Sequence, residues 1–290
     1  MLSIDWRPLV LGEKIPESLL DKVYPGRIED VLPKLPSESV DVIFADPDYN
    51  VGIKYQGKTY TRKFDDYIAW CVSWAKECRR VLKSDGNFFI INYPKQNAYL
   101  RTRYLDGAFS PPNGVRDYVW VYKANVGQGA RHFTTAHRSI LHCVKSESNK
   151  FYKDAVAMPY QNPTDRRIRK LIASGSPGRM PYSWFEFNLV KNVGFTKTFH
   201  ACQIPEPLTE MLLKATTRKG DVALVLFGGS GSELAVCQRL GLHFISAETE
   251  PAYVKIIEER LKRKGEVPSE FRMMTMMKAR KKQTANEALG

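Results

Sequence analysis

The stretch VDVIFADPDYNVGIKY, residues 40–55, decides how this chain folds. Its first part, VDVIFAD at 40–46, is apolar on both faces, which is typical of a strand buried in a parallel sheet. The run then stops on two carboxylates around a proline, followed by a tyrosine and an amide. A turn would explain these residues, and so would an active site at the end of the strand.

Two parts of the chain, about residues 20–100 and 200–262, alternate short apolar runs with helical patterns. After the opening strand, apolar residues at three- and four-residue spacings predict a helix over 65–83, and NFFIINY predicts a strand at 87–93. The second part repeats this rhythm, with predicted helices at 205–217, 233–240 and 251–264 and strands at 221–227 and 243–248. We therefore expect an α/β sheet whose parallel strands carry ligands beyond their carboxyl ends.

The amino-acid composition excludes several classes of protein. Hydrophobic residues make up 43% of the chain and aromatic residues 11%, which excludes a disordered chain and predicts an ample core. The five cysteines show no C-x-x-C spacing, and His132, His137 and His142 lack partner cysteines or carboxylates, so neither disulfides nor a metal site is expected. No apolar run approaches the roughly 20 residues that span a bilayer, and the N-terminus resembles no signal peptide. We expect a soluble, cytoplasmic protein.

The formal net charge of +13 predicts affinity for polyanions, of which nucleic acid is the first candidate. Region 101–199 concentrates basic and aromatic residues around two predicted strands, at 117–123 and 138–145. Such residues suit a groove for phosphates and unstacked bases, although a solvated insertion with a small core of its own would show the same composition. The residues that we expect to contact nucleic acid are Lys54, Arg131, Phe133, Arg166, Arg167, Arg169 and Lys170.

A glycine-rich turn, FGGSG at 227–231, lies between a predicted strand and a predicted helix. Glycines let the backbone approach a ligand closely, and the helix N-terminus behind them favours negative charge. About 20 residues on, the next strand ends in Glu248, whose carboxylate can accept hydrogen bonds from ribose hydroxyls. The turn does not match G-x-G-x-x-G, so S-adenosylmethionine, which has no pyrophosphate, fits better than a dinucleotide. A plain helix N-terminus is the simpler alternative.

Asp46 and Glu248 both stand at carboxyl ends of predicted strands, so we expect them to face one crevice. The Asp46 carboxylate can accept one N–H bond of an amino group on a base ring, and the Pro47 carbonyl can accept the other, which returns lone-pair density to the nitrogen. Tyr49 is expected to stack on a base flipped out of the duplex. Attack on a sulfonium methyl group is then mainly a matter of in-line positioning.

Four motifs resemble, in order, those of the β group of amino-methylating DNA methyltransferases, the adenine-N6 and cytosine-N4 enzymes. ADPDYNVGIKY is similar to their D-P-P-Y motif, RRVLKSDGNFFI to R-V-L-K-x-x-G, HACQIPEPL to H-P-x-Q-x-P-x-x-L, and LFGGSGS to D-P-F-x-G-S-G-T. The resemblance implies that Asp46, Pro47 and Tyr49 are catalytic. It also implies that the cofactor S-adenosylmethionine is bound by Phe227, Gly228, Gly229, Ser230, Gly231, Glu248, His200 and Gln203.

The same resemblance implies a Rossmann-like S-adenosylmethionine-dependent sheet with permuted motif order. Residues 20–100 and 200–262 would form the catalytic domain, 101–199 an inserted target-recognition region, and 263–290 a basic tail. The expected activity is methylation of a flipped base in double-stranded DNA at a specific sequence, with adenine N6 favoured over cytosine N4 because the motif opens with aspartate. The suggested partners are a cognate restriction endonuclease and a second copy of the chain, with RMMTMM in the tail as the candidate seam. DNA binding would associate the protein with the nucleoid.

The sequence departs from the family motifs at two places that bear on catalysis and on cofactor binding. Asp48 replaces the second proline and adds a charge beside Asp46. One of the two pKa values should rise if both carboxylates face the pocket, and little should change if Asp48 turns to solvent or to Lys54. Val225-Leu226 replaces Asp-Pro of the cofactor motif. A catalytically silent nucleic-acid-binding subunit and an RNA methyltransferase therefore stay open as alternatives.

Overall fold

A computed structural model describes residues 14–55, 58–109, 114–123, 130–190, 194, 196–273 and 275–277, with the backbone alone at 54, 55 and 58. A hairpin in these ranges pairs β3 (Lys54–Tyr55) with β4 (Lys58–Thr59). The main sheet is separate, and its eight described strands are, in spatial order, β1 (Lys22–Pro25), β10 (His243–Glu248), β9 (Val222–Val225), β2 (Val40–Ala45), β5 (Leu82–Asn92), β7 (His137–Val144), β6 (Val115–Val121) and β8 (Trp184–Glu186).

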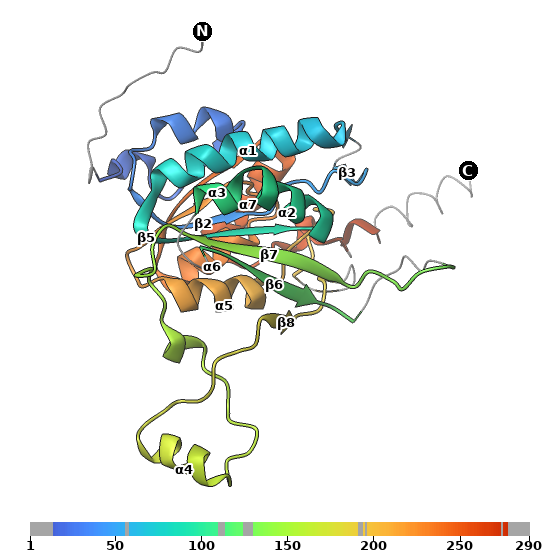
Figure 1. The fold of residues 1–290 in the computed structure, drawn as a ribbon. Helices are drawn as coiled ribbons and strands as arrows, with labels where there is room; N and C mark the ends of the chain where they lie inside the picture. The colour runs from blue at the N-terminus through green and yellow to red at the C-terminus, as the bar shows by residue number, and fades with distance from the viewer. Residues whose placement is uncertain are drawn as a thin grey trace.

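Helices cover both faces of the sheet (Figure 1). One face carries α1 (Phe64–Val81), α2 (Pro94–Leu100) and α3 (Asp106–Ala108), with a π-helical turn at Arg101–Leu105. The opposite face carries α5 (Glu206–Thr216) and α6 (Ser232–Leu240), and α7 (Pro251–Lys262) packs against α6 and β1. Short 3-10 helices lie at Glu17–Leu19, Ile28–Asp30, Leu32–Lys34, Lys153–Val156 and Ser269–Phe271. The predicted α/β architecture is confirmed.

Strand β2 shows why helices are needed on both faces. All six of its residues are buried, and successive side chains point to opposite faces of a sheet. Ile43 belongs to the core cluster that contains Trp74 of α1, whereas Phe44 belongs to the cluster that contains Leu212 of α5. Burying one such side chain contributes about 1.5–3 kcal/mol. Both faces of the strand are therefore stabilised by helices.

The direction of chain progression reverses between β2 and β9. From β2 the sheet continues to β5 on one side, and from β9 it continues to β10 on the other. Phe44 pairs with Val225, and the Leu226 N–H donates to the Phe44 carbonyl at 3.0 Å. The carboxyl ends of β2 and β9 therefore open side by side, at the kind of switch point where α/β sheets bind ligands.

The boundary between α1 and β5 differs from the prediction. The helix ends at Val81, and Leu82 already pairs with Val40. Residues 84–86, between the predicted helix and the predicted strand, therefore lie within an irregular part of β5. Gly86 allows this early pairing of β5 with β2. A Cβ at this position would lie 2.7 Å from Leu82 Cδ1 and 2.9 Å from the Asp41 carbonyl oxygen, so only glycine allows the two strands to approach here.

Region 101–199 contributes to the main sheet. The strands predicted at 117–123 and 138–145 appear as β6 and β7, and β7 pairs antiparallel with β5. Trp120 and Ile140 belong to the same core cluster as Phe44. These two strands therefore extend the central core rather than enclosing a separate one.

A projecting arm, residues 157–183, leaves the body between β7 and β8. It carries α4 (Arg166–Ala173) at its far end (Figure 1). The two limbs of the arm are joined by backbone hydrogen bonds between Met158 and Arg179, 2.8 Å in each direction. Asp165 caps α4 by accepting from the Arg167 and Ile168 N–H groups. The arm thus holds its helix away from the sheet.

The basic tail is described only in part. The Met273 N–H donates to the Lys197 carbonyl at 2.9 Å, which ties the start of the tail to the loop before α5. Part of RMMTMM and all of 278–290 lie outside the described residues. Among the residues that are described, no helix has the length and apolar character to cross a membrane.

Candidate active site

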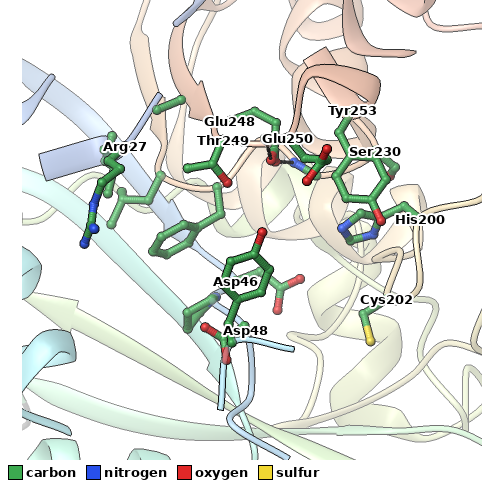
Figure 2. A pocket seen from close by; sticks show the side chains of 18 of the residues that line it. Arg27, Asp46, Asp48, His200, Cys202, Ser230, Glu248, Thr249, Glu250 and Tyr253 are labelled. Atoms are coloured by element: carbon green, nitrogen blue, oxygen red, sulfur yellow. Dashed lines mark hydrogen bonds between the residues drawn. The ribbon is translucent and has the colours of Figure 1, made fainter. Parts of the chain in front are cut away.

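A cavity of about 480 Å³ opens at the carboxyl ends of β2, β9 and β10. The turn after β2, the glycine turn after β9 and the acid at the end of β10 all line it. Figure 2 shows Asp46 and Asp48 on one side of this space and Glu248 across from them. Two stretches that are far apart in the sequence therefore form one site, as expected from the strand ends.

Three hydrogen bonds hold the turn that follows β2. The Tyr67 hydroxyl donates to the Asp48 carbonyl at 2.7 Å and accepts from Asn92 Nδ2 at 2.8 Å. Gln96 Nε2 donates to the Tyr49 carbonyl at 2.9 Å. These supports come from α1, β5 and α2, so the packed core fixes the backbone of the turn.

Asp46 lies at the start of this turn, and its surroundings raise its pKa to about 7. Burial is the main cause, whereas the hydrogen bond from the Tyr49 hydroxyl, 2.7 Å long, and the charge of Arg138 act in the opposite direction. A carboxylate held in a water-poor wall is a strong acceptor, and a pKa near neutrality is common at reactive sites. Asp46 is therefore suited to accept an N–H bond from an amino group.

Arg138 of β7 lies beside Tyr49, a position that the sequence did not indicate. Its guanidinium carbon is 3.7 Å from the ring centre of Tyr93, 5.1 Å from that of Tyr49 and 5.4 Å from that of Tyr122. It also donates a hydrogen bond to the Tyr122 hydroxyl. Desolvated cation–π contacts contribute about 2 kcal/mol. Arg138 thus holds together the aromatic wall next to Asp46.

Asp48, the departure from the motif, is paired with arginine. Its Oδ2 lies 3.5 Å from Arg62 Nη1, and its Oδ1 accepts the Asn50 N–H at 3.0 Å. Burial raises its pKa, and these contacts act against that rise. Arg62 also lies 4.3 Å from the ring centre of Trp70. Both carboxylates of the turn line the cavity, but the charge of Asp48 has its own counter-ion.

The glycine turn allows a close approach of the backbone. Gly229 has φ +52° and Gly231 has φ +72°, which favour glycine. A Cβ on Gly228 would lie 2.8 Å from Ile257 Cδ1. Glu248 accepts the Gly229 N–H at 2.7 Å and the Glu250 N–H at 2.9 Å, so its carboxylate is fixed at the wall. The fixed carboxylate and the bare backbone fit an adenosine cofactor without pyrophosphate.

The remaining predicted cofactor residues divide into two groups. Phe227, Gly228, Gly229, Ser230 and His200 line the cavity. Gly231 and Gln203 do not contribute to its described lining. Gly231 is the N-cap residue of α6. The Gln203 side chain donates to the Thr196 carbonyl and accepts the Thr198 N–H, so it holds the loop that carries His200. Gln203 therefore shapes the pocket through this loop.

His200 is a neutral member of the wall. Burial, and next the charge of Lys197, lower its pKa to about 3. Its ring lies 4.7 Å from that of Tyr253, and a Cβ on Gly229 would lie 3.2 Å from its Nε2. The imidazole therefore packs directly against the glycine turn.

The residues predicted to contact nucleic acid fall at three separate places. Arg131 and the fully exposed Phe133 lie in the segment before β7, and Lys54 lies in β3. The structure places the four basic residues of RRIRK on α4 at the end of the projecting arm, where all four are exposed. Arg131, Phe133 and the four basic residues of α4 do not line the described part of the cavity. No group of three or more metal-ligating side chains occurs in the described ranges.

Several lining residues had no signal in the local sequence. They come from the segment after β1, from the segment between β4 and α1, from α1 itself, from the loop before α5 and from the first turns of α6 and α7. Helical periodicity marks Trp70 and Glu233 as part of a helix, but it cannot show that they reach a cavity. The lining residues that sequence reasoning missed include Arg27, Glu29, Tyr60, Arg62, Trp70, Cys202, Glu233 and Tyr253.

The chain is similar in sequence to known DNA methyltransferases. Residues 40–259 match the N6/N4 methyltransferase family model, described as DNA methylase. The DNA adenine methyltransferase YhdJ of Escherichia coli is 30% identical over 88% of this chain and 86% of its own length. The type II methyltransferase M.BglII of Bacillus subtilis is 28% identical over 86% of this chain and 71% of its own length.

Two solved structures share the fold. The cytosine-N4-specific PvuII DNA methyltransferase aligns with a TM-score of 0.63 at 20% identity, over 82% of this chain and 85% of that one. The M1.HpyAVI–SAM complex aligns with a TM-score of 0.55 at 18% identity, over 82% of this chain and 98% of that one. The eight-stranded sheet and the helices on its faces agree with this likeness in fold.

Proposed function

The chain belongs to the N6/N4 DNA methylase family, and we propose that it methylates adenine N6 at a specific sequence in double-stranded DNA. As a DNA methyltransferase of this family it uses S-adenosylmethionine. The observation that carries the proposal is the shared cavity of Asp46, Glu248 and the glycine turn. The adenine assignment is supported by the aspartate that opens the motif and by the name of the E. coli relative.

The residues around the cavity would have separate roles in binding the cofactor and in methyl transfer. When bound, the cofactor supplies a methyl group on a positively charged sulfur. Glu248 would hold its ribose hydroxyls, and Phe227 with the glycine turn would hold the methionyl part. Asp46 would accept one N–H of the target amino group and the Pro47 carbonyl the other, which leaves the nitrogen lone pair free to attack. Tyr49 would stack on the flipped base.

The target-recognition role of 101–199 stays part of the proposal. It is supported by the exposed basic residues of α4 and by the exposed aromatic ring of Phe133. Lysine and arginine neutralise phosphates, while aromatic rings stack on unpaired bases. Lys54 and Arg131 are proposed to contact the duplex as well. We also keep as predictions a cytoplasmic, nucleoid-associated location, a homodimer, and a cognate restriction endonuclease, the last supported by the type II name of M.BglII.

Labelled S-adenosylmethionine and unmodified double-stranded DNA test the proposal. The wild type should transfer label, and Asp46→Asn should reduce the rate by at least about a hundredfold, because positioned hydrogen-bond acceptors contribute factors of that order. Asp66→Asn on the exposed face of α1 is the matched control and should behave as wild type. Sequencing of modified bases in the product then identifies base, position and motif together.

Three outcomes would count against parts of the proposal. Methylcytosine in the product would replace adenine N6 by cytosine N4, the specificity named for the PvuII enzyme. DNA binding without transfer by the wild type would favour the silent subunit. Transfer to RNA in preference to DNA would favour the RNA methyltransferase.

A further inference from the structure

Glu233 is a buried carboxyl in the first turn of α6 that has no role in the methyl transfer proposed for Asp46 and Pro47. Its side chain is 5% exposed, and it lines the same cavity as Asp46 and Gly229. Within the described ranges, no ion pair joins its carboxylate to a lysine, arginine or histidine. An acidic group so far from water is costly unless a positive charge comes to it. Glu233 therefore presents an unpaired carboxyl to the cavity.

The buried cation whose charge reaches Glu233 has other partners. Arg260 of α7 is bonded through Nη2 to Glu206. Its Nη1 donates to the Ser230 carbonyl at 2.9 Å, and its Nε donates to the Gly265 carbonyl at 3.0 Å. These contacts keep its guanidinium on Glu206 and on backbone carbonyls. Arg260 thus does not pair directly with Glu233.

Glu233 and Asp46 are electrostatically coupled. Burial raises the pKa of Glu233 to about 8, and the charge of Asp46 is the next cause. The backbone N–H of Glu233 and the charge of Arg260 act against this rise, while Glu206 adds to it. Two carboxyls in one water-poor space cannot both ionise freely. A bound cation would remove this conflict, because it attracts both charges. A positively charged group bound in this cavity near Asp46 and Glu233 would therefore be stabilised by both carboxyls.

The proposed function supplies that group, and the inference rests on it. The methyl must meet the target nitrogen at Asp46, so the sulfur that carries it has to bind at the Asp46 end. S-adenosylmethionine has a positive charge on this sulfur, and S-adenosylhomocysteine, the product, does not. We propose that Glu233 determines the preference of the enzyme for the methyl donor over the product by binding the charge that only the donor carries. After transfer the sulfur is neutral, so Asp46 and Glu233 no longer have a sulfonium to attract, and the product is bound less tightly than the donor.

Calorimetric titration without DNA tests this proposal, because binding is measured apart from transfer. Glu233→Gln should weaken S-adenosylmethionine about tenfold, which corresponds to ~1.4 kcal/mol, while S-adenosylhomocysteine should change by less than about twofold. Unchanged product affinity also shows that the variant is folded. Glu258→Gln, an exposed acid on α7, is the matched control and should leave both affinities as in wild type. Glu233→Asp keeps the charge and should keep the donor-to-product ratio within about threefold.

Proton release provides a second readout. At pH 7 the free Glu233 carboxyl holds its proton for most of the time, given a pKa of about 8. Donor binding should therefore release more protons than product binding, when heats are compared in two buffers of different ionisation enthalpy. Glu233→Gln should remove most of this difference in proton release. The protons that are still released would come from Asp46.

Two results would overturn the inference. One is equal weakening of donor and product in Glu233→Gln, which indicates a structural role or a contact with the α-ammonium that both ligands carry. The other is that neither affinity changes, which indicates that the charge is bound elsewhere. Failure of the wild type to bind S-adenosylmethionine at all would contradict the proposed function itself, so the two failures are distinguishable.

Discussion

The hydroxyl of Tyr49 donates a 2.7 Å hydrogen bond to Oδ1 of Asp46. The ring expected to stack on the target base is 3% exposed, and its hydroxyl occupies the acceptor expected to hold the target amino group. A target amino group that binds to Oδ1 has to compete with this bond. The phenol hydroxyl and the target N–H would therefore share one acceptor.

Tyr49→Phe should shift the acidic limb of the kcat/KM profile to higher pH. The hydrogen bond from Tyr49 lowers the pKa of Asp46, so its removal should raise that pKa further. The phenyl ring still stacks, and at high pH activity should stay within about tenfold of wild type, because only a hydroxyl contact is lost. Tyr99→Phe, an exposed tyrosine of α2, is the control. An unchanged limb, or one at lower pH, would contradict the contact.

The wild-type enzyme should lose activity as the pH falls through about 7. Burial raises the pKa of Asp46 to about 7, and only the ionised carboxylate accepts the N–H bond. At pH 5 about one carboxyl in a hundred is ionised, so kcat/KM should be about a hundredfold below its plateau. Initial rates at limiting DNA measure this profile. A limb centred near 4 would mean that Asp46 is more hydrated than its surroundings indicate.

Asp48→Asn tests whether the motif departure has a catalytic role. The asparagine oxygen can still accept the Asn50 N–H, and the lost ion pair with Arg62 is 3.5 Å long and partly exposed. Such pairs contribute about 0–1 kcal/mol. Activity should remain within about threefold of wild type, with little change in the urea midpoint. A loss as large as that of Asp46→Asn would instead identify Asp48 as a catalytic group.

Asp41 should matter for stability and not for the site. It is 1% exposed, accepts from Lys150 at 2.6 Å and Lys83 at 2.8 Å, and accepts the Val222 N–H at 2.9 Å. Hydrogen bonds to a buried charged group contribute about 1.5–3 kcal/mol, and the two lysines that remain are partly exposed, so Asp41→Asn should lower the free energy of unfolding by about that amount. Urea unfolding measures it, and folded Asp41→Asn should bind S-adenosylmethionine as the wild type does.

The pH dependence of this contribution follows from the sign of the pKa shift. Burial raises the pKa of Asp41, but the bonds from Lys150, Lys83 and Val222 lower it more, so the folded value is depressed. The stabilisation should be present above the unfolded pKa of about 4 and disappear as the pH falls through the folded value. A difference between wild type and Asp41→Asn that persists unchanged at low pH would argue against the ion pairs.

The projecting arm should contribute to DNA affinity through charge. Glutamine at Arg166, Arg167, Arg169 and Lys170 together should weaken DNA binding and reduce the slope of log K against log salt by up to about 3–4, if each contacts a phosphate. S-adenosylmethionine affinity should not change, because α4 lies far from the cavity lining. Glutamine at Lys255, Lys262, Arg263 and Lys264, four exposed positions on and after α7, removes the same charge elsewhere. Equal losses in both variants would show only a non-local effect of net charge.

Local patterns predicted those parts of the site that stand at strand ends. Asp46 follows an apolar run and Glu248 ends another, and the carboxyl ends of parallel strands meet at one edge of a sheet. Gln203 shows the limit of motif reasoning, because its side chain turns to Thr196 and Thr198 while its neighbour His200 reaches the cavity. A motif indicates a neighbourhood, but packing decides which of its side chains faces the ligand.

The sequence by itself determined the alternation of strands and helices, the acids at the strand ends and the glycines of the turn, since each of these depends on residues close in the chain. Only the tertiary structure decided that β6 and β7 join the central sheet, that Arg138 braces Tyr49, and that Arg62 pairs with Asp48. It also decided that Glu233 shares a cavity with Asp46. The reason is physical: these contacts depend on strand order and on which helix face is buried, and both are set by the packing of the whole core.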